Sequence, residues 1–188
     1  MNSTTPKPDE PNLGEAMDSP QLVATLLAQL ARRGWKLAGA ESLTGGMITS
    51  TIVDVPGASE VLLGGVVTYT DAIKNQVLGV SETLLETYTA YSGECALAMA
   101  AGARKLFGAE IAFAATGVAG PGSDQGFNPG IGFVACVSPS SSRIRSLRLP
   151  ADWERGRIRE AFTRAALDLI HEVLATDTGR NPVLGLPR

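Results

Sequence analysis

Ser42 is the residue of this sequence that is best placed to act as a nucleophile. It follows a short apolar segment, residues 36–40, and precedes the small-residue turn Thr44-Gly45-Gly46, after which a helical pattern begins. Ligand sites of α/β proteins gather where strands end, and glycines let a substrate approach the backbone closely. Free N–H groups at the following helix start could bind an oxyanion or a phosphate. On pattern alone, a simpler interpretation is equally good: Ser42 or Thr44 only caps the helix.

A serine nucleophile needs a base, and Lys74 is the candidate. The single histidine, His171, falls outside the apolar stripe of the last expected helix, which argues against a Ser-His-Asp triad. Lys74 lies in the first turn of a helix that starts near Asp71, where the helix dipole and burial favour the uncharged amine. Such an amine can accept a proton from serine, and Tyr69 could orient the lysine or contact the substrate. Taken alone, Lys74 would be interpreted as a solvated surface lysine.

Two further features could hold an anionic or ribose group. A glycine-rich loop, residues 116–123, begins with Thr116-Gly117 and follows an apolar strand, but it lacks the Gly-Lys-Ser/Thr of a Walker loop. Arg155 and Arg159 lie four residues apart at the start of the last helix, so they share a face and could clamp a phosphate. The spacing alone favours a charged, solvated first helical turn for the arginines, and a flexible connection is the alternative for the loop.

The elements that must position these residues alternate along the chain. Helical patterns cover 21–33, 44–53, 71–77, a short stretch from 81, 92–107 and 153–175, and strand patterns cover 36–40, 61–69, 110–115, 131–137 and 143–149. This order predicts a single-domain, three-layer α/β/α sandwich with a mixed central sheet. The nearly continuous apolar run 61–69 is expected to be covered on both faces.

The ends of the chain have a different composition from its centre. Residues 1–18 are rich in proline and polar residues and 177–188 in glycine and proline, so both are expected to be loose tails around a domain of residues 19–176. Ser19-Pro20 is expected to provide the N-cap and first position of the first helix.

Composition excludes several classes of function. A chain of 188 residues with 44% hydrophobic content suits one compact domain, and a net charge of −3 leaves no footprint for nucleic acid or an anionic membrane. No apolar run reaches the ~20 residues of a membrane helix, and no secretory signal is visible, so the cytoplasm is the expected compartment. Cys95 and Cys136 are expected to be small buried hydrophobes. We expect no metal and no cofactor.

Taken together, these segments resemble the C-terminal domain family of the competence-damage-inducible protein CinA, which also occurs as a stand-alone nicotinamide-nucleotide amidohydrolase. The matching segments are Ala-Glu-Ser-Leu-Thr-Gly-Gly (40–46), Val-Pro-Gly-Ala-Ser (55–59), Gly-Gly-Val-Val-Thr-Tyr (64–69) with Lys74, Leu-Gly-Val (78–80), Met99-Ala100, Thr-Gly-Val-Ala-Gly-Pro (116–121), and Arg155 with Arg159. They span roughly residues 21–175 in the right order and spacing. The resemblance leaves no room for the N-terminal domain that some members carry.

The resemblance implies hydrolysis of the carboxamide of nicotinamide mononucleotide to nicotinate mononucleotide and ammonia, a step of pyridine nucleotide salvage. It places the family's functional residues on Ser42, Tyr69, Lys74, Thr116 and Arg155, with Arg159 as a second arginine. Ser42 would be the nucleophile and Lys74 the base. From geometry we expect backbone N–H groups near 44–46 to hold the oxyanion. The implied partners are a small nucleotide substrate and further copies of the chain in a homodimer or higher homo-oligomer.

This sequence also departs from the family pattern. Asp71 stands where Asn is common, Tyr91 lies in a segment that is usually Gly-Ala-Val-Ser, and the segment 128–132 lacks a usual lysine. These changes leave two alternatives to the nucleotide amidase. One is a non-catalytic nucleotide- or partner-binding module with the same fold. The other is a serine amidase that acts on a different small amide.

Overall fold

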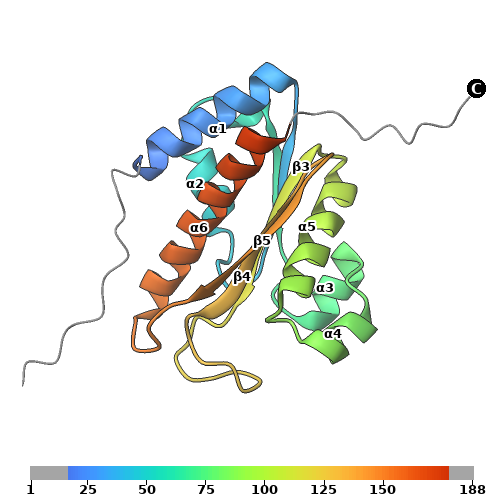
Figure 1. Ribbon diagram of the computed structural model, residues 1–188, viewed down its shortest axis with the longest axis vertical. Helices are drawn as coiled ribbons and strands as arrows, with labels where there is room; N and C mark the ends of the chain where they lie inside the picture. The colour runs from blue at the N-terminus through green and yellow to red at the C-terminus, as the bar shows by residue number, and fades with distance from the viewer. Residues whose placement is uncertain (1–16, 178–188) are drawn as a thin grey trace, which may run out of the picture.

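A five-stranded sheet with the order β2-β1-β3-β4-β5 forms the centre of the molecule (Figure 1). The computed structural model describes residues 17–177. The strands are β1 (Leu37–Glu41), β2 (Leu62–Val67), β3 (Ile111–Gly117), β4 (Ile131–Val137) and β5 (Ser142–Arg148). β1 pairs in parallel with both β2 and β3, whereas β4 and β5 continue the sheet in antiparallel fashion. The sheet is therefore mixed, as predicted.

Helices cover both faces of this sheet (Figure 1). One face carries α1 (Ser19–Arg33), α2 (Met47–Val53) and α6 (Arg155–Thr176), and the other carries α3 (Asp71–Leu78), α4 (Glu82–Tyr88) and α5 (Gly93–Phe107). Each face has its own apolar cluster, so two hydrophobic layers hold the helices to the sheet. The predicted three-layer α/β/α sandwich is confirmed.

Local sequence explains where most helices begin and end. Thr70 and Ser92 cap α3 and α5 by accepting main-chain N–H groups of the first turn, and Gly79 and Gly108 end the same helices in left-handed conformations. Two predicted starts were wrong. The cap of α1 is Asp18, whose carboxylate accepts from the N–H of Gln21 at 2.8 Å, and Ser19 is already helical. α2 starts at Met47 rather than at residue 44, because the preceding residues form a tight turn.

β1 and β3 are buried along their whole length, but β2 is not. The prediction that strand 61–69 is covered on both faces was wrong. Its residues alternate between partly buried and exposed, and Leu63 and Val67 are 44% and 48% exposed. The reason is its position: β2 is an edge strand that pairs with β1 on one side only, so the helices cover it incompletely.

The folded domain extends one residue beyond its predicted end. Asp177 is only 3% exposed, and its carboxylate accepts hydrogen bonds from the hydroxyls of Ser138 and Ser140 in the β4–β5 turn. A buried carboxylate that ties this turn to the end of α6 belongs to the domain rather than to a loose tail. The rest of the two predicted tails, residues 1–16 and 178–188, lies outside the described residues.

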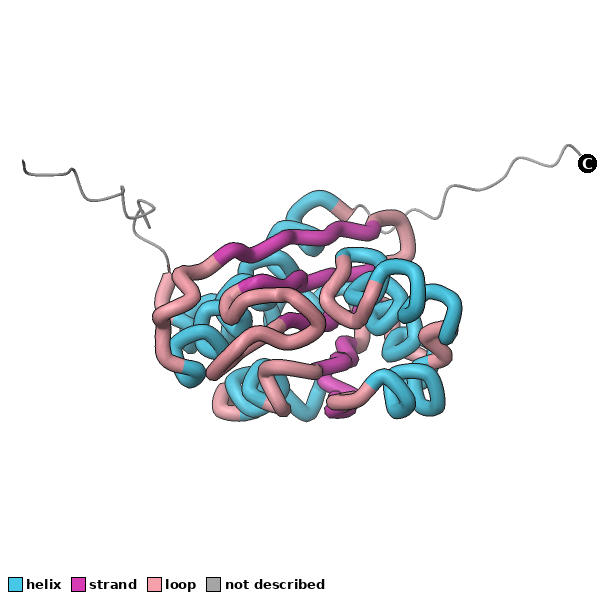
Figure 2. The backbone as a smooth tube through the Cα atoms, turned by 90° about the horizontal axis from the view of Figure 1, so that it is seen from below, coloured by secondary structure: helices cyan, strands magenta, loops and turns pink. Residues whose placement is uncertain are grey.

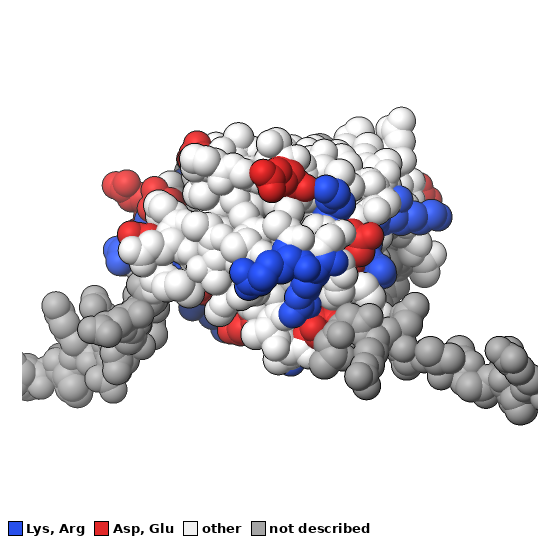
Figure 3. Space-filling view, turned by 90° about the horizontal axis from the view of Figure 1, so that it is seen from above, with Lys and Arg blue, Asp and Glu red and all other residues white. Residues whose placement is uncertain are grey.

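Seen from below the view of Figure 1, loops cover the near end of the sheet, and helices lie on both sides of the strands (Figure 2). On the opposite end, basic and acidic side chains are interspersed among uncharged ones (Figure 3). Among residues 17–177, the helices are all too short or too polar to span a bilayer.

Gly102 offers a test of the packing between α3 and α5. A Cβ at this position would lie 2.2 Å from the carbonyl oxygen of Leu78, whereas a Cβ at the helical Gly156 would have open space. We expect Gly102→Ala to lower the free energy of unfolding by about 1–2 kcal/mol, since overpacking outweighs the gain in helix propensity. Gly156→Ala, the control, should be neutral or slightly stabilising. Urea denaturation checks both, and equal stability of the two variants would contradict the close α3–α5 contact.

Candidate active site

The candidate site lies where the strand order reverses. β1 sits between β2 and β3, and the connections from β1 and β2 run over opposite faces of the sheet, so a crevice opens beyond the carboxyl end of β1. Ser42 is the first residue after β1. The backbone is held on both sides there, because the Ser42 N–H donates to Ala115 O at 2.9 Å and the Thr68 N–H donates to Glu41 O at 2.8 Å.

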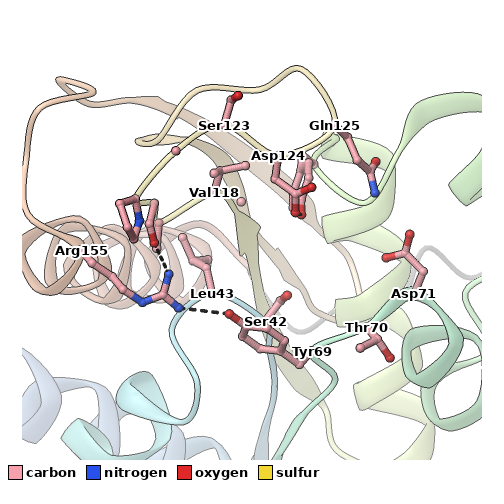
Figure 4. Close-up of a pocket in the computed structure, with 16 residues that line it drawn as sticks. Ser42, Leu43, Tyr69, Thr70, Asp71, Val118, Ser123, Asp124, Gln125 and Arg155 are labelled. Carbon is pink, nitrogen blue, oxygen red and sulfur yellow. Dashed lines mark hydrogen bonds between the residues drawn. The ribbon is translucent and has the colours of Figure 1, made fainter.

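A cavity of about 490 Å³ occupies this crevice (Figure 4). Ser42, Tyr69, Gly117 and Arg155 are the predicted site residues that line it. The remaining lining residues come from the turn after β1, the start of α3, Tyr91 and the loop after β3: Leu43, Thr70, Asp71, Tyr91, Val118, Ala119, Gly120, Pro121, Gly122, Ser123, Asp124 and Gln125. Cavities of this size suit small ligands.

The sequence interpretation missed Glu41, which fixes the turn that carries Ser42. Its carboxylate is fully buried and accepts four hydrogen bonds: from the N–H groups of Gly46 (2.9 Å), Ile48 (3.1 Å) and Thr49 (2.8 Å), and from the Thr49 hydroxyl (2.6 Å). A carboxylate in this place satisfies the free donors of a helix start and interacts favourably with the helix dipole. The only sequence signal was an acidic residue at a position where the strand pattern requires burial.

This carboxylate changes the expected oxyanion site. The N–H of Gly46 is bound to Glu41, and the N–H of Gly45 donates to Ser42 O at 3.1 Å, so both glycines serve the turn itself. Their left-handed φ angles of 60° and 95° make the tight turn possible. Within residues 17–177, no hydrogen bond occupies the N–H groups of Leu43 and Thr44. These two groups are the remaining donors of the turn that could hold an oxyanion.

Thr44 itself lies behind the turn. It is fully buried, its hydroxyl has no hydrogen-bond partner among the described residues, and it does not line the cavity. The Thr44 side chain therefore does not reach a ligand in the cavity.

Lys74 is buried rather than solvated, so the surface interpretation was wrong. It is 1% exposed, and its Nζ lies 3.3 Å from Tyr69 O and 3.6 Å from the Asp71 carboxylate. Within the described part of the chain, no hydrogen bond joins Lys74 Nζ to the Ser42 hydroxyl, and Lys74 does not line the cavity. The amine lies behind the cavity wall that Tyr69 and Asp71 form.

Arg155 reaches the cavity. Its guanidinium donates to the hydroxyl of Tyr69 at 3.0 Å and to the carbonyl of Gly120, and Figure 4 shows both hydrogen bonds. These contacts join the start of α6 to the end of β2 and to the glycine-rich loop. Because a guanidinium has five N–H donors, further donors remain for a ligand.

Arg159 has a different role, so the two arginines do not form a common phosphate clamp. Its Nε donates to Leu43 O at 3.1 Å and its Nη2 to Thr44 O at 2.7 Å. Arg159 is not part of the cavity wall. It positions the turn after β1 from the side of α6, which the spacing of four residues could not reveal.

Thr116 also points away from the cavity. It is fully buried, and its hydroxyl donates to Ala90 O at 2.6 Å. Gly117, in contrast, lines the cavity, and a Cβ there would lie 2.7 Å from Ile131 O. The cradle after β3 is therefore built from backbone and small residues, whereas Thr116 positions the α4–α5 connection.

Tyr91 is a second residue that the sequence interpretation did not assign to the site. Its hydroxyl donates to the Asp124 carboxylate, and its ring packs edge-on against Phe127 with centroids 5.6 Å apart. Burial raises the pKa of Tyr91 well above its usual value, and the nearby Asp124 and Asp71 carboxylates raise it further. Tyr91 thus fastens the loop after β3 across the cavity. The sequence feature that could have pointed to Tyr91 was its presence in a segment that departs from the family pattern.

The buried Cys95 is not a competing nucleophile. Burial raises the pKa of its thiol to about 11, although Lys74 opposes the shift, so the thiol stays protonated near neutral pH. Burial likewise raises the pKa of Cys136. Both cysteines are free and buried, which confirms the prediction of small buried hydrophobes. Residues 17–177 contain no group of three or more His, Cys, Asp or Glu side chains that could hold a metal ion.

Comparison with known proteins identifies the family. Residues 19–174 match the family model described as the CinA C-terminal domain. The chain belongs to the CinA C-terminal domain family. A CinA-like protein of Frankia casuarinae is 43% identical over 162 residues, which cover 86% of this chain and 36% of that protein. A CinA-like protein of Mycobacterium avium is 42% identical over 159 residues, which cover 81% of this chain and 35% of that protein. The chain thus spans little more than a third of the length of these relatives.

Solved structures of the CinA family share the fold described above. The competence/damage inducible protein CihA of Agrobacterium tumefaciens superposes with a TM-score of 0.80 at 32% identity, covering 85% of this chain and 96% of that one. A competence or damage-inducible protein of Enterobacter asburiae gives a TM-score of 0.75 at 28% identity, covering 84% and 96% of the two chains. The α/β/α sandwich with a mixed sheet is therefore the family fold.

The role of Glu41 in this CinA-family domain can be tested by Glu41→Gln. An amide nitrogen would then face main-chain N–H donors, so at least one buried donor loses its acceptor. We expect the free energy of unfolding to fall by about 2–4 kcal/mol in urea denaturation. Thr49→Val, which removes one of the hydrogen bonds, should cost only about 1 kcal/mol. A Glu41→Gln protein as stable as the wild type would refute the proposed anchoring.

The burial of Tyr91, together with its contact with the Asp124 carboxylate, predicts a pH effect. The pKa of Tyr91 is raised in the folded state, so above about pH 10 the unfolded state loses a proton that the folded state keeps, and stability falls as the pH rises. Tyr91→Phe should lose less stability than the wild type between about pH 8 and about pH 11. Tyr88→Phe is the control, because Tyr88 is half exposed and its hydroxyl makes no hydrogen bond within residues 17–177. Identical pH profiles for the wild type and Tyr91→Phe would contradict the buried position of Tyr91 beside Asp124.

Proposed function

We propose that this domain is an amidohydrolase that converts nicotinamide mononucleotide and water to nicotinate mononucleotide and ammonia, a step in pyridine nucleotide salvage. The observation that carries the proposal is the position of Ser42. It follows β1 at the point where the strand order reverses, and it lines a cavity of about 490 Å³ together with Tyr69 and Arg155. A nucleophile, a cation for a phosphate and a backbone cradle thus share one cavity.

In the first step, the Ser42 hydroxyl oxygen attacks the carboxamide carbon while the amine of Lys74 accepts the hydroxyl proton. The carbonyl electrons move to oxygen, and the N–H groups of Leu43 and Thr44 are the donors proposed to stabilise that oxyanion. The intermediate then collapses, the C–N bond breaks, and Lys74 returns the proton to the departing nitrogen as ammonia leaves. The product of this step is an ester on Ser42.

In the second step, water cleaves this ester with the same base. Lys74 accepts a proton from the attacking water, and the ester oxygen leaves as Ser42 with that proton. The product is a carboxylic acid, which ionises to the carboxylate by giving its proton to water or to the released ammonia. The ammonia comes from the first step, and no redox change or metal is needed for the balance.

Lys74 must approach Ser42 for this chemistry. Its amine contacts Tyr69 O and Asp71 in the structure, without a hydrogen bond to Ser42 among the described residues. A lysine side chain has enough rotatable bonds to turn from one acceptor to another, and catalytic hydrogen bonds are often long in ligand-free enzymes. Its burial beside the end of β2 supports a role for Lys74 as the base, because a lysine is rarely buried without a function or a partner.

The same contacts give a second candidate function some support. If Lys74 only ties the end of β2 to α3 through Tyr69 O and Asp71, the domain would bind a nucleotide without hydrolysing it. The cavity, Arg155 and the glycine-rich loop would serve such a binding module equally well. A serine amidase for another small amide would share the chemistry and differ in the ligand.

The decisive experiment is ammonia release from nicotinamide mononucleotide by the wild type, Ser42→Ala and Lys74→Ala. We expect each variant to lose at least about 10³-fold in kcat, because removing either the nucleophile or its base stops the same step. Ser59→Ala and Lys105→Ala are matched controls at exposed positions outside the cavity and should keep full activity.

Calorimetric binding of the mononucleotide to the same proteins separates the candidates. Turnover that persists in Ser42→Ala would remove the proposed nucleophile. A folded wild type that binds the nucleotide without releasing ammonia would favour the binding module, whereas one that neither binds nor hydrolyses it would direct the search to other small amides.

A further inference from the structure

The charged side chains of the cavity are divided between its two sides. Among the residues that line it, Asp71 and Asp124 are acidic and Arg155 is basic. In Figure 4, Arg155 lies on one side of the view and Asp71 on the other, with Ser42 between them and Asp124 on the loop opposite. The two acidic residues come from different elements, the start of α3 and the loop after β3.

Among the described residues, neither carboxylate is paired with a cation that itself lines the cavity. Asp124 accepts from the Tyr91 hydroxyl, which is uncharged. Asp71 lies 3.6 Å from Lys74, but that amine is buried behind it, while the Asp71 side chain is 44% exposed. Both carboxylates raise the pKa of Tyr91, so their negative potential reaches the same part of the cavity wall. This side of the cavity therefore attracts a cation.

A ligand that carries only negative charge would not match this cavity. Its anionic group would pair with Arg155, but the opposite wall would repel the rest of the ligand. A ligand with an anion at one end and a cation at the other would satisfy both sides. Charge pairs inside a partly enclosed cavity are also stronger than in bulk water, because the local dielectric constant is lower.

We propose that Asp71 and Asp124 are specificity-determining residues that select a substrate with a positively charged ring, with Arg155 taking the phosphate of the same molecule. This inference rests on the proposed function and names the charge pattern that the cavity recognises. A nicotinamide ring joined to ribose through its nitrogen is a pyridinium cation. Its dihydro form has nearly the same shape, amide and phosphate, but the ring is uncharged.

The test compares these two ligands in a Ser42→Ala background, which prevents turnover. Isothermal titration calorimetry gives the dissociation constants of nicotinamide mononucleotide and of dihydronicotinamide mononucleotide. We expect a preference of about tenfold or more for the cationic ring, and we expect Asp71→Asn and Asp124→Asn each to reduce that preference by about 3- to 10-fold. Binding of the dihydro form should change little or improve.

The variants keep the local structure. An asparagine at position 124 can still accept from the Tyr91 hydroxyl through its amide oxygen, and one at position 71 is tolerated at a helix start. Asp54→Asn is the matched control, because Asp54 is exposed and lies outside the cavity. It should leave the preference unchanged.

The outcomes separate this inference from the amidase proposal. If the wild type hydrolyses the mononucleotide but neither aspartate variant changes the ring preference, the inference is overturned and the amidase stands. If the preference depends on the two aspartates but the wild type releases no ammonia, the inference stands and the amidase proposal fails. If neither nucleotide binds, both are overturned.

Discussion

The buried carboxylate of Glu41 is the interaction on which the candidate site depends. A turn that enters the core after a strand brings main-chain N–H and C=O groups away from water, and each of them needs a partner. Glu41 satisfies the N–H groups at the start of α2, and Arg159 satisfies the carbonyls of Leu43 and Thr44. The N–H groups of this turn thus face the negative carboxylate of Glu41, and its carbonyl groups face the positive guanidinium of Arg159. Ser42 lies within this turn, so its position follows from charges that never touch the ligand.

The sheet and the last helix then bring distant residues to the same turn. Tyr69 follows the neighbouring strand, and Arg155 joins it to Gly120 across the cavity through hydrogen bonds that span 86 and 35 residues of sequence. The glycine-rich loop is fastened on its far side by Tyr91 and Asp124, which are 33 residues apart. The cavity therefore exists only when α6, the edge strand and the loop are all in place, although no single one of them contains the chemistry.

The sequence predicts the layers of the fold because hydrophobic periodicity is a local property. A strand followed by small residues is also a local pattern, and it makes Ser42 a candidate nucleophile, although the same pattern fits a helix cap equally well. The sequence could not show which residues contact one another in the folded protein. The spacing of Arg155 and Arg159 shows that they share a helix face, but their different targets depend on where α6 docks. The apolar run of β2 suggested burial on both faces, but edge position is set by strand order, which the run does not encode. Glu41 was missed because its partners belong to a helix start whose geometry the sequence leaves open.

If the domain has the proposed function, Asp71 would connect substrate binding with catalysis, because it would contact both the cationic ring and Lys74. It lines the cavity, where a cationic ring would approach it, and it lies 3.6 Å from the buried amine of Lys74. Two cations beside one carboxylate compete for it, so a bound cationic ring would weaken the pairing of Asp71 with Lys74 and leave the lysine side chain freer to turn toward Ser42. The arrival of the correct substrate would thus help to bring the proposed base toward the nucleophile. With an uncharged ring of the same shape, Asp71 would stay paired with Lys74. Such a substrate would both bind more weakly and react more slowly.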